Sequence, residues 1–278
     1  ERSRGLGDVY KRQLQGLEKT KGAEHSETLQ SCYNLARVLA QKECFEEAEI
    51  LYRRELAGLE KGDEQDKISA LQTKIQLADV LEQKEFYDDA EDLYREALAG
   101  YESTKGLDDP STLQTCYSLA TVLAKKGSLD EAEKLYRREL SGIEKEKGPD
   151  HPSTLQTCCN LAEVLMEKKG FDEAESLYRR SLLAYEKEMG ATSQHTLDAC
   201  CRLAAILVRI KKIPEAIVLL RKYIGADGAK EEDIKSLRYN LACYECLSKN
   251  YDEAKKILDK HFEIFPDHLE LALTDSDL

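Results

Sequence analysis

The side chains most capable of chemistry in this sequence are nine cysteines and five histidines. Four cysteines share one recurring position, four residues before the alanine of a Leu-Ala pair: Cys32, Cys116, Cys158 and Cys200. Such a position lies on the apolar face of a helix, where a small thiol packs as a core residue. We interpret these four as core, and Cys159 and Cys201 as their outward neighbours.

The remaining candidates for metal binding are equally weak. Cys243 and Cys246 form a lone C-x-x-C within a predicted helix, with no second pair and no histidine nearby in sequence, which is not a zinc pattern. His25, His151 and His195 fall in one recurring loop position some 42 residues apart or more. We interpret them as turn residues, and predict no metal and no cofactor.

Catalytic motifs are not found either. The native sequence contains no nucleophile elbow, dinucleotide fingerprint, P-loop or zinc-protease motif. Its carboxylates are dispersed on predicted helix surfaces instead of converging on one pocket. We therefore predict that this chain is not an enzyme.

Composition excludes further classes of protein. The 278 residues include 54 acidic and 41 basic ones, giving a net charge of −13. So acidic a surface repels phosphate backbones, which argues against a nucleic-acid partner. The longest apolar run, residues 203–208, has six residues, whereas a membrane span needs about 20. We expect a helix-rich cytoplasmic protein.

The elements that position these residues are repeated. A Leu-Ala pair recurs with spacings of 42, 42, 42, 42 and 38 residues, and its alanines are Ala36, Ala78, Ala120, Ala162, Ala204 and Ala242. A second alanine follows 12 residues after each one, at Ala48, Ala90, Ala132, Ala174, Ala216 and Ala254. Self-similarity at a fixed period is typical of stacked repeats. We call these twelve residues the marker alanines.

Each copy is predicted to be a pair of antiparallel helices. In the fourth copy, apolar residues at helical spacing over 155–165 predict a first helix, and Ala174, Tyr178 and Leu182 mark a second one. We expect the marker alanines to lie where the two helices cross. The recurring Tyr-Arg-Arg run follows Glu at i,i+4, so we interpret its arginines as a solvated, ion-paired face.

These residues carry a family resemblance. Leu-Ala, an alanine twelve residues later, an aromatic residue four beyond it and a closing Pro266 resemble the tetratricopeptide repeat. The 42-residue copies, with "GPDHPSTLQT", "NLAEVL", "FDEAESLYRR" and "EKEMG", are similar to the kinesin-light-chain type. The resemblance implies an all-α, right-handed α-solenoid of about six helical hairpins between Glu27 and Pro266, without β-sheet.

The resemblance also divides the chain. Residues 1–13 are set aside, because Ser3–Gln13 resembles a translated sequencing adapter. Residues 14–24 match the end of an upstream repeat, 25–230 hold five repeats of the 42-residue type, and 231–278 form a terminal capping repeat with a truncated tail. The second copy departs from the pattern, with Lys74 at the cysteine position and no proline in its loop, and we expect it to be looser.

In this family the first helices line a groove. The corresponding positions here are Gln30, Asn34, Arg37, Gln72, Gln76, Asp79, Gln114, Ser118, Thr121, Gln156, Asn160 and Glu163. The many amides can donate to and accept from the backbone of an extended peptide, although amides also simply keep a helix face soluble. With Glu82, Lys125 and Glu167 added, four carboxylates face two cations, which predicts a neutral or basic peptide bound by Asn34, Gln76 and Asn160.

Two functions remain open at this stage. One is a non-catalytic scaffold of the kinesin-light-chain cargo-adaptor type, whose motor-complex partner is implied by the resemblance alone. The other is a regulatory or oligomerisation domain of a larger enzyme or signalling protein. A coiled coil upstream would favour the first, and a catalytic domain in the complete sequence would favour the second.

Overall fold

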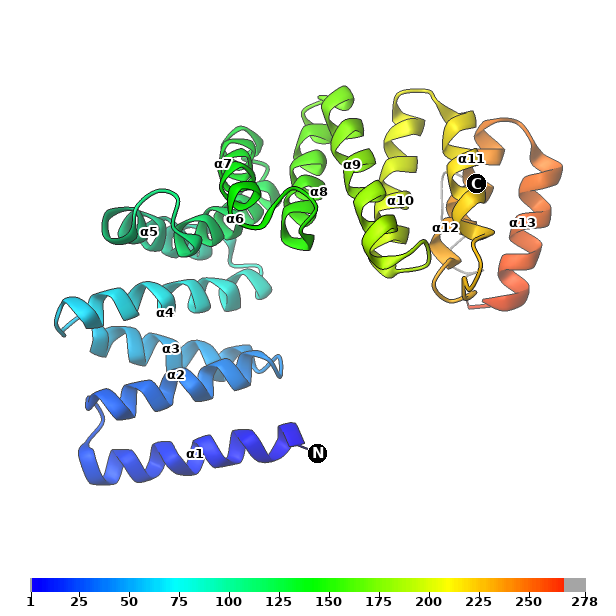
Figure 1. The fold of residues 1–278 in the computed structure, drawn as a ribbon. Coiled ribbons are helices and arrows are strands. Elements are labelled where there is room, and N and C mark those ends of the chain that lie inside the picture. Colours follow the sequence, from blue (N-terminus) through cyan, green and yellow to red (C-terminus); the bar gives the residue numbers. More distant parts are fainter. Residues whose placement is uncertain (1, 268–278) are drawn as a thin grey trace. The chain divides into compact units, whose positions relative to one another are not determined.

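The computed structural model describes residues 2–267, which are folded into helices throughout. Within that range there are thirteen helices and no strand, which confirms the all-α repeat fold (Figure 1). Their bounds are α1 Arg2–Lys21, α2 Ser26–Ala40, α3 Phe45–Leu59, α4 Glu64–Gln83, α5 Tyr87–Lys105, α6 Pro110–Lys125, α7 Leu129–Lys147, α8 Pro152–Glu167, α9 Phe171–Met189, α10 Gln194–Arg209, α11 Ile213–Ile224, α12 Lys235–Leu247 and α13 Tyr251–Ile264. The helices α2 to α13 follow one another as the six predicted pairs.

The chain forms two compact units, residues 1–142 and 143–278, with the boundary inside α7. In the N-terminal unit each helix from α1 to α6 packs on the next, and α4 also contacts the other first helices, α2 and α6 (Figure 1). In the C-terminal unit the same succession runs from α8 to α13, and α10 contacts α12. In each of these two successions, a helix therefore packs on the one that follows it in the chain.

The predicted segment boundaries stay predictions. Helix α1 runs without interruption through the adapter-like residues 3–13 and the upstream remnant to Lys21. The last part of the predicted capping repeat, 268–278, lies outside the described residues. The division into five long repeats and a capping repeat stays a prediction.

The core of each repeat is built on small residues. All twelve marker alanines are at most 1% exposed. In the first four repeats the tyrosine four residues after the second marker alanine is almost completely buried, and we call these four the core tyrosines: Tyr52, Tyr94, Tyr136 and Tyr178. Close packing of this kind leaves no room for an extra methylene group.

A second close approach, at glycine, was not predicted from the sequence. A Cβ built on Gly58, Gly100 or Gly142 would lie only 2.4 Å from a methyl carbon of a leucine on the preceding helix. Those leucines are Leu29, Leu71 and Leu113. The backbone of each second helix thus rests directly on a leucine of the first, and the missing side chain permits this contact.

The loops between repeats are held by a threonine–glycine contact. In four repeats a buried threonine in the first helical turn donates its hydroxyl to a glycine carbonyl six residues earlier, at 2.8–2.9 Å. The pairs are Thr28 with Gly22, Thr112 with Gly106, Thr154 with Gly148 and Thr196 with Gly190. All four glycines have φ between 87° and 94°, which is the region that glycine tolerates best.

The second repeat begins differently from the others. Its helix α4 is preceded by Asp63, whose carboxylate accepts from the backbone N–H groups of Gln65 and Asp66, while Asp66 caps the N–H of Asp63 in return. This capping box replaces the threonine–glycine contact.

The second repeat also compensates for Lys74. The Lys74 ammonium lies 2.7 Å from the carboxylate of Glu96, and Glu96 stands where other copies carry the second arginine of the Tyr-Arg-Arg run. Cysteine and arginine have thus been exchanged for lysine and glutamate as a pair. Neither this contact nor the capping box indicates a looser copy.

The histidine prediction is half right. His25 and His151 are N-cap residues whose Nδ1 atoms accept from backbone N–H groups two residues on, at 3.2 Å. His195 was misplaced, because Ser193 occupies the N-cap of α10. His195 lies two residues after this N-cap, inside α10, and its ring stacks on Tyr185, with ring centroids 5.4 Å apart.

The cysteine prediction needs one correction. Cys32, Cys116, Cys158 and Cys200 are all 0% exposed, as expected of core residues. Cys159, expected to point outward, is 5% exposed and contacts Ser181 of the following helix. Cys201 is half-buried and contacts Asn240. A side chain three residues before a marker alanine therefore faces the adjacent helix as well as the solvent.

The arginine run is ion-paired, as predicted. Each Tyr-Arg pair places its arginine on the glutamate one turn earlier, for example Arg53 on Glu49 at 2.9 Å and Arg179 on Glu175 at 2.8 Å. The second arginine joins neighbouring repeats in the same way, as Arg54 does with Glu18 at 2.6 Å. These exposed pairs each contribute a few tenths of a kcal/mol.

Three glutamates are at most 4% exposed, namely Glu55, Glu139 and Glu245, and Glu55 contacts the next repeat. Glu55 of α3 is 4% exposed and accepts from the Thr73 hydroxyl of α4 at 3.2 Å. Burial raises the pKa of Glu55 to about 8, although the Thr73 hydrogen bond acts in the opposite direction. The side chain is therefore neutral at pH 7.

The marker alanines give a first prediction. Ala120→Leu should lower the free energy of unfolding by about 1–3 kcal/mol, because the added atoms have no space in a packed core. Urea unfolding of the full chain measures this, with Ala99→Leu on the exposed face of α5 as the matched control. Equal midpoints for the two variants would show that Ala120 is not at a close helix contact.

Glu55 gives a second prediction, on pH dependence. The unfolded carboxyl keeps its ordinary pKa, so the stability that Glu55 contributes is complete below about pH 4.5 and is lost as the pH rises through about 8. Glu55→Gln keeps the shape without the ionisation. Between pH 5 and pH 9 the variant should gain about 3–5 kcal/mol relative to wild type. Urea titrations at both pH values test this, and a constant difference would contradict it.

Candidate functional site

The predicted groove residues occupy one face of successive first helices. Nine lie in the N-terminal unit: Gln30, Asn34 and Arg37 on α2, Gln72, Gln76 and Asp79 on α4, and Gln114, Ser118 and Thr121 on α6. All nine are exposed or half-buried. We call them the first-helix face of the N-terminal unit. Gln156, Asn160 and Glu163 lie on α8 in the C-terminal unit and are likewise accessible.

Asp79 is the centre of a hydrogen-bonded group on this face. The buried Tyr94 hydroxyl donates to Asp79 Oδ1 at 2.5 Å, and Gln76 Nε2 donates to Asp79 Oδ2 at 2.9 Å. Burial raises the pKa of Asp79 to about 6, against the effect of the Tyr94 hydrogen bond. Gln76 is thus occupied within the chain, so the predicted bond from its amide N–H to a peptide has a competitor.

The charged residues of the face are largely paired between helices. Lys125 of α6 lies 2.8 Å from Glu82 of α4. In the C-terminal unit Glu163 of α8 forms an ion pair with Arg202 of α10, a residue left out of the sequence-based charge count. These two ion pairs neutralise Glu82 and Glu163, which are two of the four carboxylates counted from the sequence.

Three amides on the face remain available. Among the described residues, no hydrogen bond joins Gln30, Asn34 or Gln114 to another side chain or to the backbone through their amide groups. In the C-terminal unit, by contrast, Gln156 Nε2 donates to Asn160 Oδ1 at 3.0 Å. The N-terminal unit is therefore better prepared to bond an external backbone.

Tyrosines also lie on this face, although their positions were not predicted from the sequence. Tyr33 of α2, three residues before a marker alanine, is half-buried and packs edge-on against Tyr52, with ring centroids 5.8 Å apart. It also contacts Gln72 of α4, and burial is the main cause that raises the Tyr33 pKa. Tyr117 repeats the arrangement against Tyr136. Because this position holds Tyr, Ile, Tyr, Cys and Cys along the chain, its recurrence was hard to recognise.

Neither a metal-binding cluster nor a membrane-spanning helix is found among the described residues. Among the described residues, no three or more His, Cys, Asp or Glu side chains are grouped so that they could hold a metal ion. None of the described helices is long and apolar enough to cross a membrane.

The repeated pattern is matched by known families. Models of the tetratricopeptide repeat match residues 69–145, 115–165 and 158–227, and another matches residues 31–67. The chain belongs to the tetratricopeptide repeat family. Proteins of this family are scaffolds of the kind used in protein–protein interaction, and their repeats bind peptide or protein partners.

Solved structures share this repeat fold. A Podosopora anserina protein with nearly identical TPR-like repeats, named after kinesin light chain, has a TM-score of 0.67 at 22% identity over 73% of this chain and 98% of its own. BtubC (BKLC) from P. vanneervenii has a TM-score of 0.66 at 18% identity over 80% of this chain and 91% of its own.

A third neighbour is part of a longer protein. The signal transduction ATPase PH0952 from Pyrococcus horikoshii, which has a tetratricopeptide repeat sensor, reaches a TM-score of 0.76 at 16% identity over 97% of this chain and 41% of its own. No curated protein matches the sequence. At these identities the likeness is one of fold.

The Asp79 group gives a third prediction. Tyr94→Phe removes the hydroxyl that stabilises the Asp79 carboxylate and leaves the ring in place. We expect the pKa of Asp79 to rise by about one to two units, since a hydrogen bond to a charged group is worth about 1.5–3 kcal/mol.

Carboxyl-carbon chemical shifts followed through a pH titration measure this pKa directly. Tyr136→Phe, whose hydroxyl lies 2.9 Å from Thr121 Oγ1, is the matched control and should leave it unchanged. A lower or constant pKa in Tyr94→Phe would contradict the assignment.

Proposed function

We propose that the first-helix face of the N-terminal unit binds an extended peptide segment of a partner protein. The observation that carries the proposal is the row of amides on successive first helices, of which Gln30, Asn34 and Gln114 have no partner among the described residues. An amide both donates and accepts, as a peptide group does, so it satisfies a backbone whatever its side chains are. The half-buried rings of Tyr33 and Tyr117 add apolar surface between the amides.

The charges of the face support a neutral or basic peptide. Asp79 keeps a carboxylate at the centre of the N-terminal face, and Lys125 is already paired with Glu82. Arg37 is exposed at one side of the face and would attract a single acidic group. Lacking a cluster of unpaired cations, the face offers no fork of donors to a desolvated acidic segment.

The finer role is that of a non-catalytic, cytoplasmic cargo adaptor like a kinesin light chain. It is supported by the 42-residue spacing and by the solved structures named after kinesin light chain. A second role, as the sensor or regulatory part of a larger signalling protein, is supported by the P. horikoshii ATPase, in which a tetratricopeptide sensor is one portion of a longer chain. The complete coding sequence distinguishes the two: heptad repeats upstream favour the adaptor, and a catalytic domain favours the regulator.

Peptide binding gives a fourth prediction. Asn34→Ala should weaken binding of an extended peptide by about 1 kcal/mol, roughly fivefold, because the peptide backbone loses one hydrogen-bond partner. A peptide array on the full chain identifies a binder, and fluorescence polarisation then measures its affinity. Gln65→Ala removes an exposed amide outside the face and should have no effect. The proposal is wrong if acidic peptides bind best and Asn34→Ala binds them as wild type does.

A further inference from the structure

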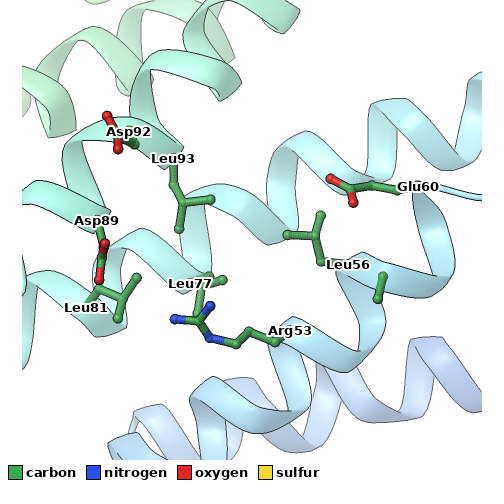
Figure 2. A pocket seen from close by; sticks show the side chains of 9 residues that line it. Arg53, Leu56, Glu60, Leu77, Leu81, Asp89, Asp92 and Leu93 are labelled. Carbon is green, nitrogen blue, oxygen red and sulfur yellow. The ribbon is translucent and has the colours of Figure 1, made fainter.

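A hollow of about 460 Å³ lies between the second helices of the first two repeats, away from the residues of the first-helix face. Figure 2 shows its walls, with Arg53 and Leu56 on α3, Glu60 directly after α3, and Asp89, Asp92 and Leu93 on α5. Leu77 and Leu81 of α4 and Ala57 of α3 complete the lining. Its floor is therefore aliphatic and its rim charged, a combination typical of sites that take a specific ligand.

A break in a repeated ion pair explains why the hollow exists. At other interfaces the basic residue directly after the core tyrosine binds a glutamate 36 residues further along the chain. Arg95 binds Glu131 through two bonds of 2.6 and 2.9 Å, and Lys11, at the equivalent position of α1, binds Glu47 at 3.0 Å. Arg179 binds Glu215 in the same way. The pair at this spacing in the hollow is Arg53 and Asp89, and no bond joins them. Aspartate is one methylene shorter than glutamate, so its carboxylate falls short of the guanidinium.

Because Asp89 forms no bond with Arg53, negative charge at the rim of the hollow is left without a partner. Arg53 is bound to Glu49, and Glu60 lies 3.3 Å from Lys74. Among the described residues, neither Asp89 nor Asp92 has a hydrogen bond or an ion pair, and both are exposed. At the next interface the position of Asp92 is held by Lys134, so two free carboxylates beside an aliphatic floor are a feature of this interface.

We propose that this hollow is a second docking site, which takes a segment of a partner protein carrying an arginine or lysine between aliphatic residues. The aliphatic side chains would cover the half-buried Leu56 and Leu93, beneath which Leu77 and Leu81 are already buried, while the cation reaches Asp89 and Asp92. Charge complementarity selects this occupant over an acidic or neutral one. The site is distinct from the peptide-binding face, because none of its lining residues belongs to that face and its charged rim lies on and directly after the second helices.

The test uses two blocked five-residue peptides that differ at the centre, one with arginine and one with glutamine between leucines. Each is titrated into the isotope-labelled full chain and followed by amide chemical shifts. The arginine peptide should shift amides of α3 and α5 and bind about tenfold more tightly than the glutamine peptide. Equal affinities, or shifts confined to α2 and α6, would overturn the proposal.

Three variants sharpen the result. Asp92→Asn should weaken the arginine peptide about five- to tenfold, whereas Asp88→Asn, the same change at a neighbouring residue that pairs with Lys126 outside the hollow, should not. Asp89→Glu keeps the charge but restores the length that reaches Arg53, so it should close the hollow, abolish binding and leave the melting temperature equal or higher. Undiminished binding to Asp89→Glu or to Asp92→Asn refutes the proposal, and Asp92→Asn decides the matter alone if Asp89→Glu does not fold.

Discussion

The whole architecture depends on how closely the two helices of a repeat approach each other. Alanine at the marker positions and glycine against a leucine bring the backbones of the two helices together, and the core tyrosines and many leucines fill the remaining space. Because the same contacts recur every 42 residues, each helical pair takes nearly the same form. That regularity aligns equivalent positions of successive first helices on one face and equivalent positions of successive second helices on another.

The two faces differ in how their polar groups are satisfied. On the second helices, ion pairs 36 residues apart connect one repeat to the next, so most charges there are already compensated. On the first helices of the N-terminal unit, several amides are left without partners, while Asp79 is held by Tyr94 and Gln76. Free hydrogen-bonding groups on a rigid surface lose little entropy on binding, which makes such a surface suited to recognition.

The fold could be read from the sequence because the Leu-Ala pattern and its period report packing that every repeat shares. The cap positions of His25 and His151 followed from the same pattern, but His195 did not, since assigning it required counting back to Ser193. The positions of the face residues could be transferred by register, yet their bonding could not. Whether Gln76 is free depends on Asp79, and whether Glu163 is free depends on Arg202 of another repeat. The hollow was beyond sequence reasoning, because its volume depends on side-chain packing between α3, α4 and α5 that the repeat pattern does not report.

The threonine–glycine contact has a consequence for how such chains change length. Donor and acceptor are six residues apart, so each of the four loops with this contact holds its shape through residues of its own, and the ion pairs that join repeats reach only to the adjacent copy. A recombination event that inserts or deletes 42 residues in phase recreates every one of these contacts at the new junction. An insertion or deletion of another length destroys both the threonine–glycine contact of the loop and the ion pair to the adjacent repeat. Gene duplication acting on this chain is therefore expected to yield folded products in whole-repeat steps, and to be eliminated at intermediate lengths.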